Sequence, residues 1–358
     1  MGQQDLRHAS RLAAYGAVST HLSLLSDRRL GEIVATAAPL GSGIGGSSAE
    51  LEVAGARVFV KRVPLTDLEL RPENLRSTAN LFGLPMFYQY GVGSAGFGAW
   101  RELAVHAMTT GWVLGNEYEG FPLLYHWRVL PDSPPQDFAD QFGGIDGAVA
   151  YWEGSSAVRE RLEAIGRSSF SLVLFLEHVP QTLSAWLADR RRAQEGEDGP
   201  LYAWVDETLA DGAEFMSSRG LVHFDAHFNN VLTDGRLIYF ADFGLALSSG
   251  FELSSDEAGF LSEHLGYDRC YVAAHLLRYH LPDSVRGGLQ HEAFLLRWAA
   301  GDRPGGIPPA IVAIINRHAA SAAVLDEFHD ALLTATKRTP YPAADIERAR
   351  NAALRTER

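Results

Sequence analysis

The sequence predicts an α+β protein, rich in strands toward the N-terminus and mainly helical toward the C-terminus. Residues 49–63 alternate apolar and polar side chains on both sides of Gly55, which is the pattern of two strands joined by a tight turn. Residues 201–216 instead carry apolar side chains at helical spacing, and the later segments are typical of helices interrupted at 301–309 and 340–342. With 358 residues, the chain is long enough to form two lobes.

Composition disfavours several classes of partner. A formal net charge of −13 opposes binding to nucleic acids and anionic membranes, which attract basic surfaces. The strongest apolar run, residues 170–176, is far too short to span a membrane, and residues 1–6 lack the features of a signal peptide. Cys270 is the single cysteine, which rules out an internal disulfide and fits a reducing compartment. We therefore expect a cytoplasmic protein whose partners include no nucleic acid and no membrane.

The N-terminal region predicts a helix followed by strands. Residues 1–30 form the expected helical extension, because apolar side chains recur at helical spacing between Leu12 and Leu25. Apolar and β-branched side chains then predict three strands, at residues 32–36, 49–53 and 57–63.

A glycine-rich motif separates the first two predicted strands. Gly41, Gly43 and Gly46 form a G-x-G-x-x-G pattern. The same pattern occurs in dinucleotide-binding folds, but there a helix follows it. Here the alternating strand 49–53 follows, which favours a hairpin that covers phosphates, with a plain glycine-rich turn as the alternative.

Two insertions interrupt the predicted strands. The first, near residues 64–99, contains four glycines between positions 91 and 98, and we expect it to be partly looped. The second, near residues 131–168, begins with a proline-rich segment and contains a predicted helix at residues 156–165.

Further regular elements are predicted between and after these insertions. Residues 100–108 have helical spacing and place Glu102 near the start of a helix, whereas residues 121–130 and 170–176 are predicted strands. A short connector follows the second of these strands, and Thr182 is positioned to cap the next helix.

The most informative stretch is residues 221–246. It contains Asp225, Asn230 five residues later, and Asp242 beyond an Asp-Gly turn that predicts a hairpin. A hairpin returns the chain on itself, so we expect Asp242 to lie beside Asn230. This order of side chains suits phosphoryl transfer from Mg-ATP, in which one Asp orients the attacking hydroxyl while an Asn and a second Asp bind the metal.

The same residues also admit simpler interpretations. Asp225 and Asn230 taken alone are common turn formers. His223, Asp225 and His227 alternate along the chain as metal ligands can, but no spaced Cys or His pair elsewhere completes a zinc site.

Taken together, these residues resemble the motifs of the protein-kinase superfamily. His223-Phe224-Asp225 followed by Asn230 is similar to the H-R-D-x-x-x-x-N catalytic loop, with Phe224 in place of arginine, and residues 242–244 match D-F-G. His227 resembles the second histidine of the H-G-D-x-H-x-x-N loop in the aminoglycoside and choline phosphotransferase branch. Both termini and both insertions lie outside the resemblance.

The resemblance implies a bilobal, protein-kinase-like α+β fold. A small β-rich N-lobe with insertions would cover residues 31–178, and a mainly helical C-lobe would cover residues 179–358. The catalytic loop would be residues 223–230 and the D-F-G segment residues 242–244, both in the C-lobe.

It also implies ATP and Mg²⁺ as cofactors and assigns residues to the nucleotide. The glycine motif would cover the phosphates, Lys61 would hold the α and β phosphates, and Glu102 would orient Lys61, with Glu73 as the alternative glutamate. A lysine whose amine reaches solvent is the alternative reading of Lys61. The backbone of Glu177 and Val179 would hold the adenine edge.

The remaining assignments concern catalysis. Asp225 would be the catalytic base, His227 would contact the γ-phosphate, and Asn230 and Asp242 would bind magnesium. Asp268, early in a predicted helix at residues 267–274, would support the catalytic loop.

The expected acceptor is a hydroxyl group, and a small molecule is favoured over a protein Ser or Thr. His227 and the absence of an A-P-E motif between residues 245 and 266 support this preference. The intact D-F-G and the glycine motif keep a Ser/Thr protein kinase as the alternative, and a pseudokinase or binding scaffold as the third. Since Phe224 removes the usual partner of an activation-loop phosphate, a protein kinase of this sequence would not need that phosphorylation.

Overall fold

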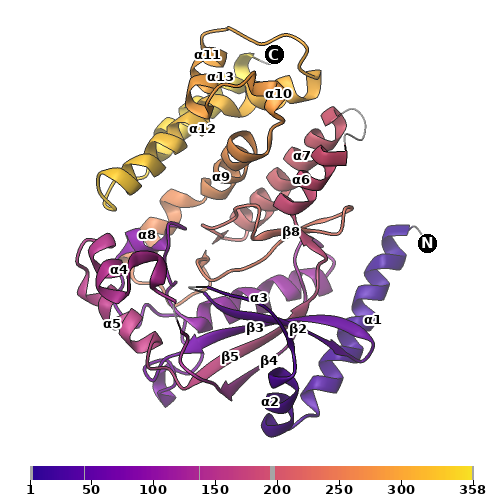
Figure 1. Ribbon diagram of the computed structural model, residues 1–358, viewed down its shortest axis with the longest axis vertical. Helices are drawn as coiled ribbons and strands as arrows, with labels where there is room; N and C mark the ends of the chain where they lie inside the picture. Colours follow the sequence, from indigo (N-terminus) through magenta and orange to yellow (C-terminus); the bar gives the residue numbers. More distant parts are fainter. Residues whose placement is uncertain (1–2, 44, 137, 194–197, 357–358) are drawn as a thin grey trace. The chain divides into compact units, whose positions relative to one another are not determined.

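The computed structural model describes residues 3–43, 45–136, 138–193 and 198–356 (Figure 1). The chain is mixed α+β, as predicted, with an N-terminal antiparallel sheet and a helical C-terminal part. It divides into two compact units. The first comprises Met1–Val179, Asp242–Ala246 and Phe251–Ser254, and the second Pro180–Ala241, Leu247–Gly250 and Ser255–Arg358.

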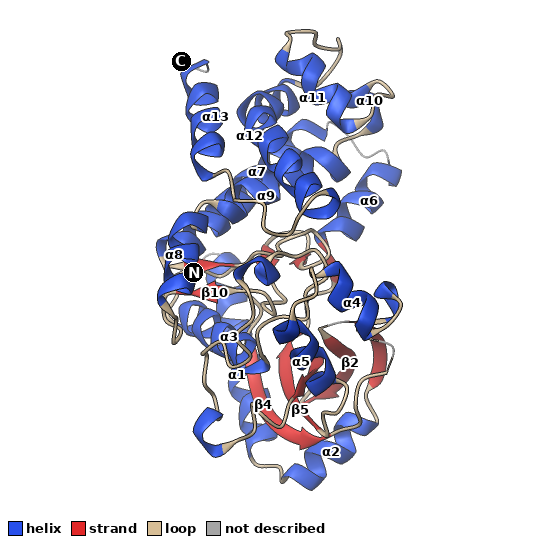
Figure 2. Ribbon diagram, turned by 90° about the vertical axis from the view of Figure 1, so that its left-hand side faces the viewer, coloured by secondary structure: helices blue, strands red, loops and turns tan. Residues whose placement is uncertain are grey.

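The first unit is built around a five-stranded antiparallel sheet in the order β1-β2-β3-β5-β4. Figure 2 shows its strands β2, β4 and β5. Its strands are β1 (Ala38–Gly43), β2 (Gly46–Val53), β3 (Ala56–Leu65), β4 (Leu124–Pro131) and β5 (Phe170–Glu177). Between β2 and β3, Ala54 and Gly55 both have positive φ angles, of 51° and 79°, as a tight hairpin turn requires. The predicted strands from residue 49 onward in this region are therefore confirmed.

Two helices precede the sheet, α1 (Gln3–Ser23) and α2 (Asp27–Ala35). Helix α1 confirms the predicted extension, whereas α2 shows that the strand predicted at residues 32–36 is wrong. Ser26 caps α2 by accepting a hydrogen bond from the N–H of Arg29 at 3.3 Å, and Leu30 is buried on its inner face. This cap and the apolar face outweigh the strand preference of the β-branched residues in the helix.

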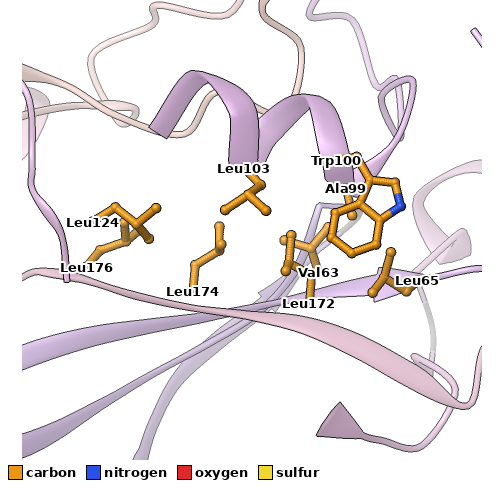
Figure 3. Packing of buried hydrophobic residues seen from close by; sticks show 9 residues of the cluster. All are labelled: Val63, Leu65, Ala99, Trp100, Leu103, Leu124, Leu172, Leu174 and Leu176. Atoms are coloured by element: carbon orange, nitrogen blue, oxygen red, sulfur yellow. The ribbon is translucent and has the colours of Figure 1, made fainter. Parts of the chain in front are cut away.

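Helix α3 (Ala99–Leu114) covers one face of the sheet (Figure 3). Its Trp100 and Leu103 pack on a row of Leu and Val side chains from β3, β4 and β5. Side chains alternate along a strand, so Lys61, two residues from the buried Val63, faces α3 as well. Arg62 points to the opposite face of the sheet.

The two insertions pack against each other, which the sequence did not predict. They contain the short 3₁₀ helices η1 (Pro72–Asn74), η2 (Met86–Gln89) and η3 (Asp140–Phe142), and the helices α4 (Ile145–Tyr151) and α5 (Ser156–Ile165). Tyr88 from the first insertion and Trp152 from the second meet edge to face, with ring centroids 4.6 Å apart. The insertions therefore share a hydrophobic cluster of their own.

The second unit combines short strands with helices. Strands β6 (Gln181–Thr182), β8 (Val231–Thr233) and β9 (Ile238–Phe240) form one sheet in the order β6-β8-β9, and β7 (Leu221–Val222) pairs with β10 (Leu247–Ser248). The helices are α6 (Leu183–Ala193), α7 (Asp198–Ser218), α8 (Ser255–His264), α9 (Tyr267–His275), α10 (Asp283–Arg286), α11 (His291–Ala299), α12 (Pro309–Thr334) and α13 (Ala343–Thr356), with a π-helical turn at Leu276–His280.

Helix α12 contacts α7, α9, α11 and α13 and so forms the centre of this helical group. The predicted hairpin of β8 and β9 is confirmed. The predicted cap of α6 is confirmed too, because Thr182 Oγ1 accepts a hydrogen bond from the N–H of Ala185 at 3.1 Å. Throughout the part of the chain that the structure describes, no helix has the length and apolar character needed to cross a membrane.

Candidate functional site

In the first unit, three predicted site residues meet at Lys61. The Nζ atom of Lys61 lies 2.7 Å from Oε1 of Glu102 and 2.7 Å from Oδ1 of Asp242. Lys61 and Glu102 are buried, whereas the Asp242 side chain is 45% exposed. A buried ammonium group is therefore shared between a buried carboxylate and one that solvent can reach.

The secondary structure explains the contact between Lys61 and Glu102. Lys61 leaves β3 on the face that α3 covers, and Glu102 lies in the first turn of α3. Burial alone would lower the pKa of Lys61, but the carboxylates of Asp242 and Glu102 raise it above its usual value, so the amine stays charged. Glu73, the alternative partner, is exposed in η1 and is not bonded to Lys61.

The segment Asp242–Ala246, expected in the C-lobe, belongs to the first unit because its neighbours there hold it. The ring of Phe243 lies edge to face with His106, at 5.1 Å between centroids. Gln89 donates a hydrogen bond to the carbonyl of Leu245. A side chain at Gly96 would place its Cβ 2.5 Å from the carbonyl oxygen of Gly244, so glycine is needed for this close approach.

The glycine motif forms the turn between β1 and β2. Gly43 pairs with Gly46 across this hairpin, so the predicted hairpin is confirmed. Gly46 has a φ of 121°, and a Cβ there would lie 2.1 Å from the carbonyl oxygen of Arg62, which excludes any side chain. A Cβ at Gly45 would lie 3.9 Å from Nζ of Lys61, so the turn passes close to the lysine amine.

Of the two residues predicted to hold adenine, Glu177 ends β5 and Val179 follows two residues later. The N–H of Glu177 already donates to the carbonyl of Leu123 at 2.8 Å. The carboxylate of Glu177 binds Arg11 of α1 through contacts of 2.8 and 2.7 Å. Val179 differs, because no described residue forms a hydrogen bond with its backbone N–H or C=O.

In the second unit, the segment between β7 and β8 carries the other predicted site residues. The Nδ2 atom of Asn230 donates to the main-chain oxygen of Asp225 and to its carboxylate Oδ2, both at 3.0 Å. The Nε2 atom of His227 lies 3.7 Å from Oδ1 of Asp225. The structure therefore brings Asp225, His227 and Asn230 together, with Asp225 partly open to solvent.

The backbone before Asp225 has an unusual conformation. Phe224 has a φ of 64°, in the left-handed region that bulky residues rarely adopt. The carboxylate of Asp268 accepts hydrogen bonds from the N–H groups of His223 at 2.6 Å and of Phe224 at 3.0 Å. Burial raises the pKa of Asp268 to about 7, although the two backbone N–H groups oppose this shift. As predicted, Asp268 supports the loop.

His223 links this loop to the end of the hairpin. Its Nε2 faces the carbonyl of Ala241 at 2.8 Å, and its Nδ1 accepts the N–H of Asp225 at 3.3 Å, so the proton resides on Nε2. The N–H of Ala241 donates to the carbonyl of Asn230 at 3.0 Å. Asp242 is the next residue in the chain, but it belongs to the first unit, so its expected meeting with Asn230 stays a prediction.

The oxygen atoms of Asn230 and Asp242 are chemically suited to magnesium. Both partners of Asn230 Nδ2 are acceptors, so the amide oxygen of Asn230 must point elsewhere, and no described residue donates to it. Mg²⁺ prefers oxygen ligands and commonly uses one or two carboxylates together with phosphates and water. Within the described ranges, no cluster of three or more His, Cys, Asp and Glu side chains is arranged for a metal.

Sequence patterns missed Arg11 and Gln89, which hold Glu177 and the segment after Asp242. Each bond joins residues more than 150 positions apart in the chain, so no local signal marks it. Comparison with known proteins adds nothing to these contacts, since no family model matches the chain and no curated protein matches its sequence.

Proposed function

We propose that this chain is a phosphotransferase that uses Mg-ATP and transfers the γ-phosphate to a hydroxyl group. The observation that carries the proposal is the position of Lys61, whose amine is held at 2.7 Å by both Glu102 and Asp242. An ion pair between a strand lysine and a helix glutamate, together with a D-F-G Asp that can bind magnesium, is what active protein kinases need.

The proposal includes a protein-kinase-like, bilobal fold. The five-stranded sheet with α3 would be the N-lobe, and the helical unit that carries Asp225 would be the C-lobe. The order of elements supports this reading, because a glycine hairpin, a lysine strand and a glutamate helix precede the catalytic loop and the D-F-G segment.

Residues of the first unit would bind the nucleotide. The turn between β1 and β2, which passes close to Lys61, would cover the phosphates, and Lys61 would hold their α and β oxygens. Val179 is the better candidate for the adenine edge, because its backbone N–H and C=O have no partner among the described residues. The N–H of Glu177 is already engaged, so Glu177 would contribute at most through its carbonyl.

Residues of the second unit would perform the transfer. Asp225 would orient the acceptor hydroxyl and accept its proton, while Asn230 holds the Asp225 carboxylate in place through Nδ2. The amide oxygen of Asn230 and the carboxylate of Asp242 would hold magnesium, which neutralises charge on the phosphates. His227, 3.7 Å from Asp225, would contact the γ-phosphate.

A small-molecule acceptor is favoured by His227 and by the absence of an A-P-E motif between residues 245 and 266. Phe224 bears on the alternative, a protein kinase. Phe224, in the place of the usual arginine, is packed against Phe260 and Tyr267 with ring centroids 5.6 and 5.2 Å away. An apolar aromatic group at this position offers no partner to an activation-loop phosphate. A Ser/Thr protein kinase that is independent of such phosphorylation is the second candidate, supported by the intact D-F-G segment.

The experiment follows the label of γ-³²P-ATP with the purified chain and magnesium. Three reactions contain no acceptor, a Ser/Thr-rich protein, or a panel of amino sugars and hydroxylated metabolites. Label on a small molecule supports the favoured acceptor, and label on protein supports the second candidate. If the chain binds Mg-ATP but transfers no label, even to water, a binding scaffold replaces the enzyme. If it does not bind Mg-ATP, the proposal is wrong.

A further inference from the structure

A cleft of about 550 Å³ lies on the first unit, away from Lys61. The turn between β1 and β2, strand β3 and the proline-rich segment after β4 form its walls. Arg62 and Pro64 line it, and both lie on the opposite face of the sheet from Lys61 and Val63 because side chains alternate along β3. Its volume falls within the range of about 300 to 1,000 Å³ that is usual for small-molecule sites.

Hydrogen bonds fix the polar side of the cleft. Among its described lining residues, Arg62 and Asp132 carry the charges. The carboxylate of Asp132 already accepts hydrogen bonds from the Ser171 hydroxyl and from the N–H of Ser133, both at 2.8 Å. Arg62 donates through Nε to the Ser47 hydroxyl at 3.0 Å and lies 3.3 Å from Asp132 through Nη1.

Arg62 therefore retains hydrogen-bond donors that its contacts with described residues do not use. A guanidinium group has five N–H donors, and the contacts of Arg62 with described residues use Nε and Nη1 and leave Nη2. The side chain lines the cleft and is 38% exposed, so solvent reaches it. A planar guanidinium fork matches the geometry of a carboxylate or a phosphate, which it binds through two parallel hydrogen bonds.

The rest of the lining combines apolar side chains with neutral polar ones, among them Ser47, Gln136 and Ser171. Pro64, Pro134, Pro135 and Phe138 supply rigid apolar surface, and Ser133 and Gln141 add neutral polar groups. Small-molecule sites commonly combine such walls with one charged group that fixes orientation. We propose that this cleft binds a small molecule that has an apolar body against the prolines and an anionic group, carboxylate or phosphate, on Arg62.

Binding of three ring compounds to the full-length chain, measured by calorimetry, tests this site directly. Phenyl phosphate and benzoate carry the two anionic groups, and benzyl alcohol is their neutral counterpart. The wild-type chain should bind at least one anion more tightly than benzyl alcohol, and the tighter of the two anions identifies phosphate or carboxylate as the group recognised. Because binding is measured and not phosphoryl transfer, the result does not depend on the proposed function.

Variants locate the site. Arg62→Gln should weaken binding of the preferred anion roughly tenfold or more, since a charge-assisted hydrogen bond is lost. Arg57→Gln, on the same strand but paired with Glu50 outside the cleft, should leave it unchanged. Ser133→Phe, which fills the cleft without changing charge, should abolish it. Wild-type binding no tighter than to benzyl alcohol, or equal weakening by Arg62→Gln and Arg57→Gln, would overturn the inference.

Discussion

The carboxylate of Asp268 accepts a hydrogen bond of 3.0 Å from the backbone N–H of Phe224, a residue held in the left-handed region at a φ of 64°. The other oxygen of Asp268 accepts the N–H of His223 at 2.6 Å. A strained backbone persists only where its surroundings fix it, and here one buried carboxylate fixes two consecutive peptide groups before Asp225. The position of the proposed catalytic base therefore depends on α9.

Asp268→Asn should destabilise the chain by about 1 to 3 kcal/mol, because the amide group places a donor against one of the two N–H groups and leaves it without an acceptor. Chemical unfolding of the purified variant measures this loss. Asp211→Asn, which removes an exposed acid on α7, is the matched control and should leave stability unchanged. Equal stability of the two variants would contradict the support that Asp268 is inferred to give.

Glu102→Gln should lower the affinity for Mg-ATP or the transfer rate at least roughly tenfold, because the amide no longer holds the charged Lys61 in place. Glu73→Gln removes the same charge from the exposed glutamate in η1 and should have no effect. Equilibrium binding of a fluorescent ATP analogue, followed by turnover, separates the two steps. A comparable loss in both variants would argue against a specific role for Glu102.

Arg11→Gln should destabilise the chain by about 3 kcal/mol, since it leaves the largely buried carboxylate of Glu177 without its counter-charge. Arg11 also donates to the carbonyl groups of Glu119 and Phe121 at 3.0 and 2.8 Å. Thermal unfolding checks this value, with the exposed Arg28→Gln as control. If Arg11→Gln unfolds like wild type, α1 does not anchor the end of β5.

Acidification should destabilise the second unit through its buried histidines. Burial lowers the pKa of His264 from 6.5 to about 4. Between pH 6.5 and 4 the unfolded chain therefore binds a proton at His264 that the folded chain does not bind. The contribution of His264 to the free energy of unfolding is thus fully present above pH 6.5, and about 3 kcal/mol of it is lost as the pH falls to 4. The raised pKa of Asp268 acts in the opposite direction between pH 3.8 and 7.

His264→Phe isolates the contribution of this histidine. The difference in unfolding free energy between wild type and His264→Phe should shift by about 3 kcal/mol in favour of the variant when pH falls from 6.5 to 4. Other titrating groups are common to both proteins and cancel in this difference. A difference that stays constant with pH would show that His264 is not held neutral.

Sequence patterns predicted correctly those helices and strands whose own residues carry a clear signal. The strand that carries Lys61, the helix that carries Glu102 and the hairpin after Asn230 each have a clear periodicity or turn signal, and the structure contains all three. The strand predicted at residues 32–36 is wrong because the Ser26 cap, upstream of its β-branched residues, starts a helix that includes most of them.

The remaining features depend on distant contacts that no local pattern encodes. Arg11 and Glu177 are 166 residues apart, and the aromatic contact between Tyr88 and Trp152 joins two insertions that are separated by other elements in the sequence. No local signal predicts the left-handed conformation of Phe224 either. Residue preference disfavours it, and the hydrogen bond to Asp268, which is 44 residues away, helps to hold it.

The most direct test of phosphoryl transfer compares wild type with Asp225→Asn. ATP turnover with magnesium, with the best acceptor from the panel or with water, should fall by about 100-fold or more, as expected for loss of a catalytic base. The dissociation constant for Mg-ATP should stay within a few-fold of wild type, and Asp211→Asn should behave as wild type in both assays. Near-normal turnover by Asp225→Asn would contradict the role of Asp225 and the mechanism built on it.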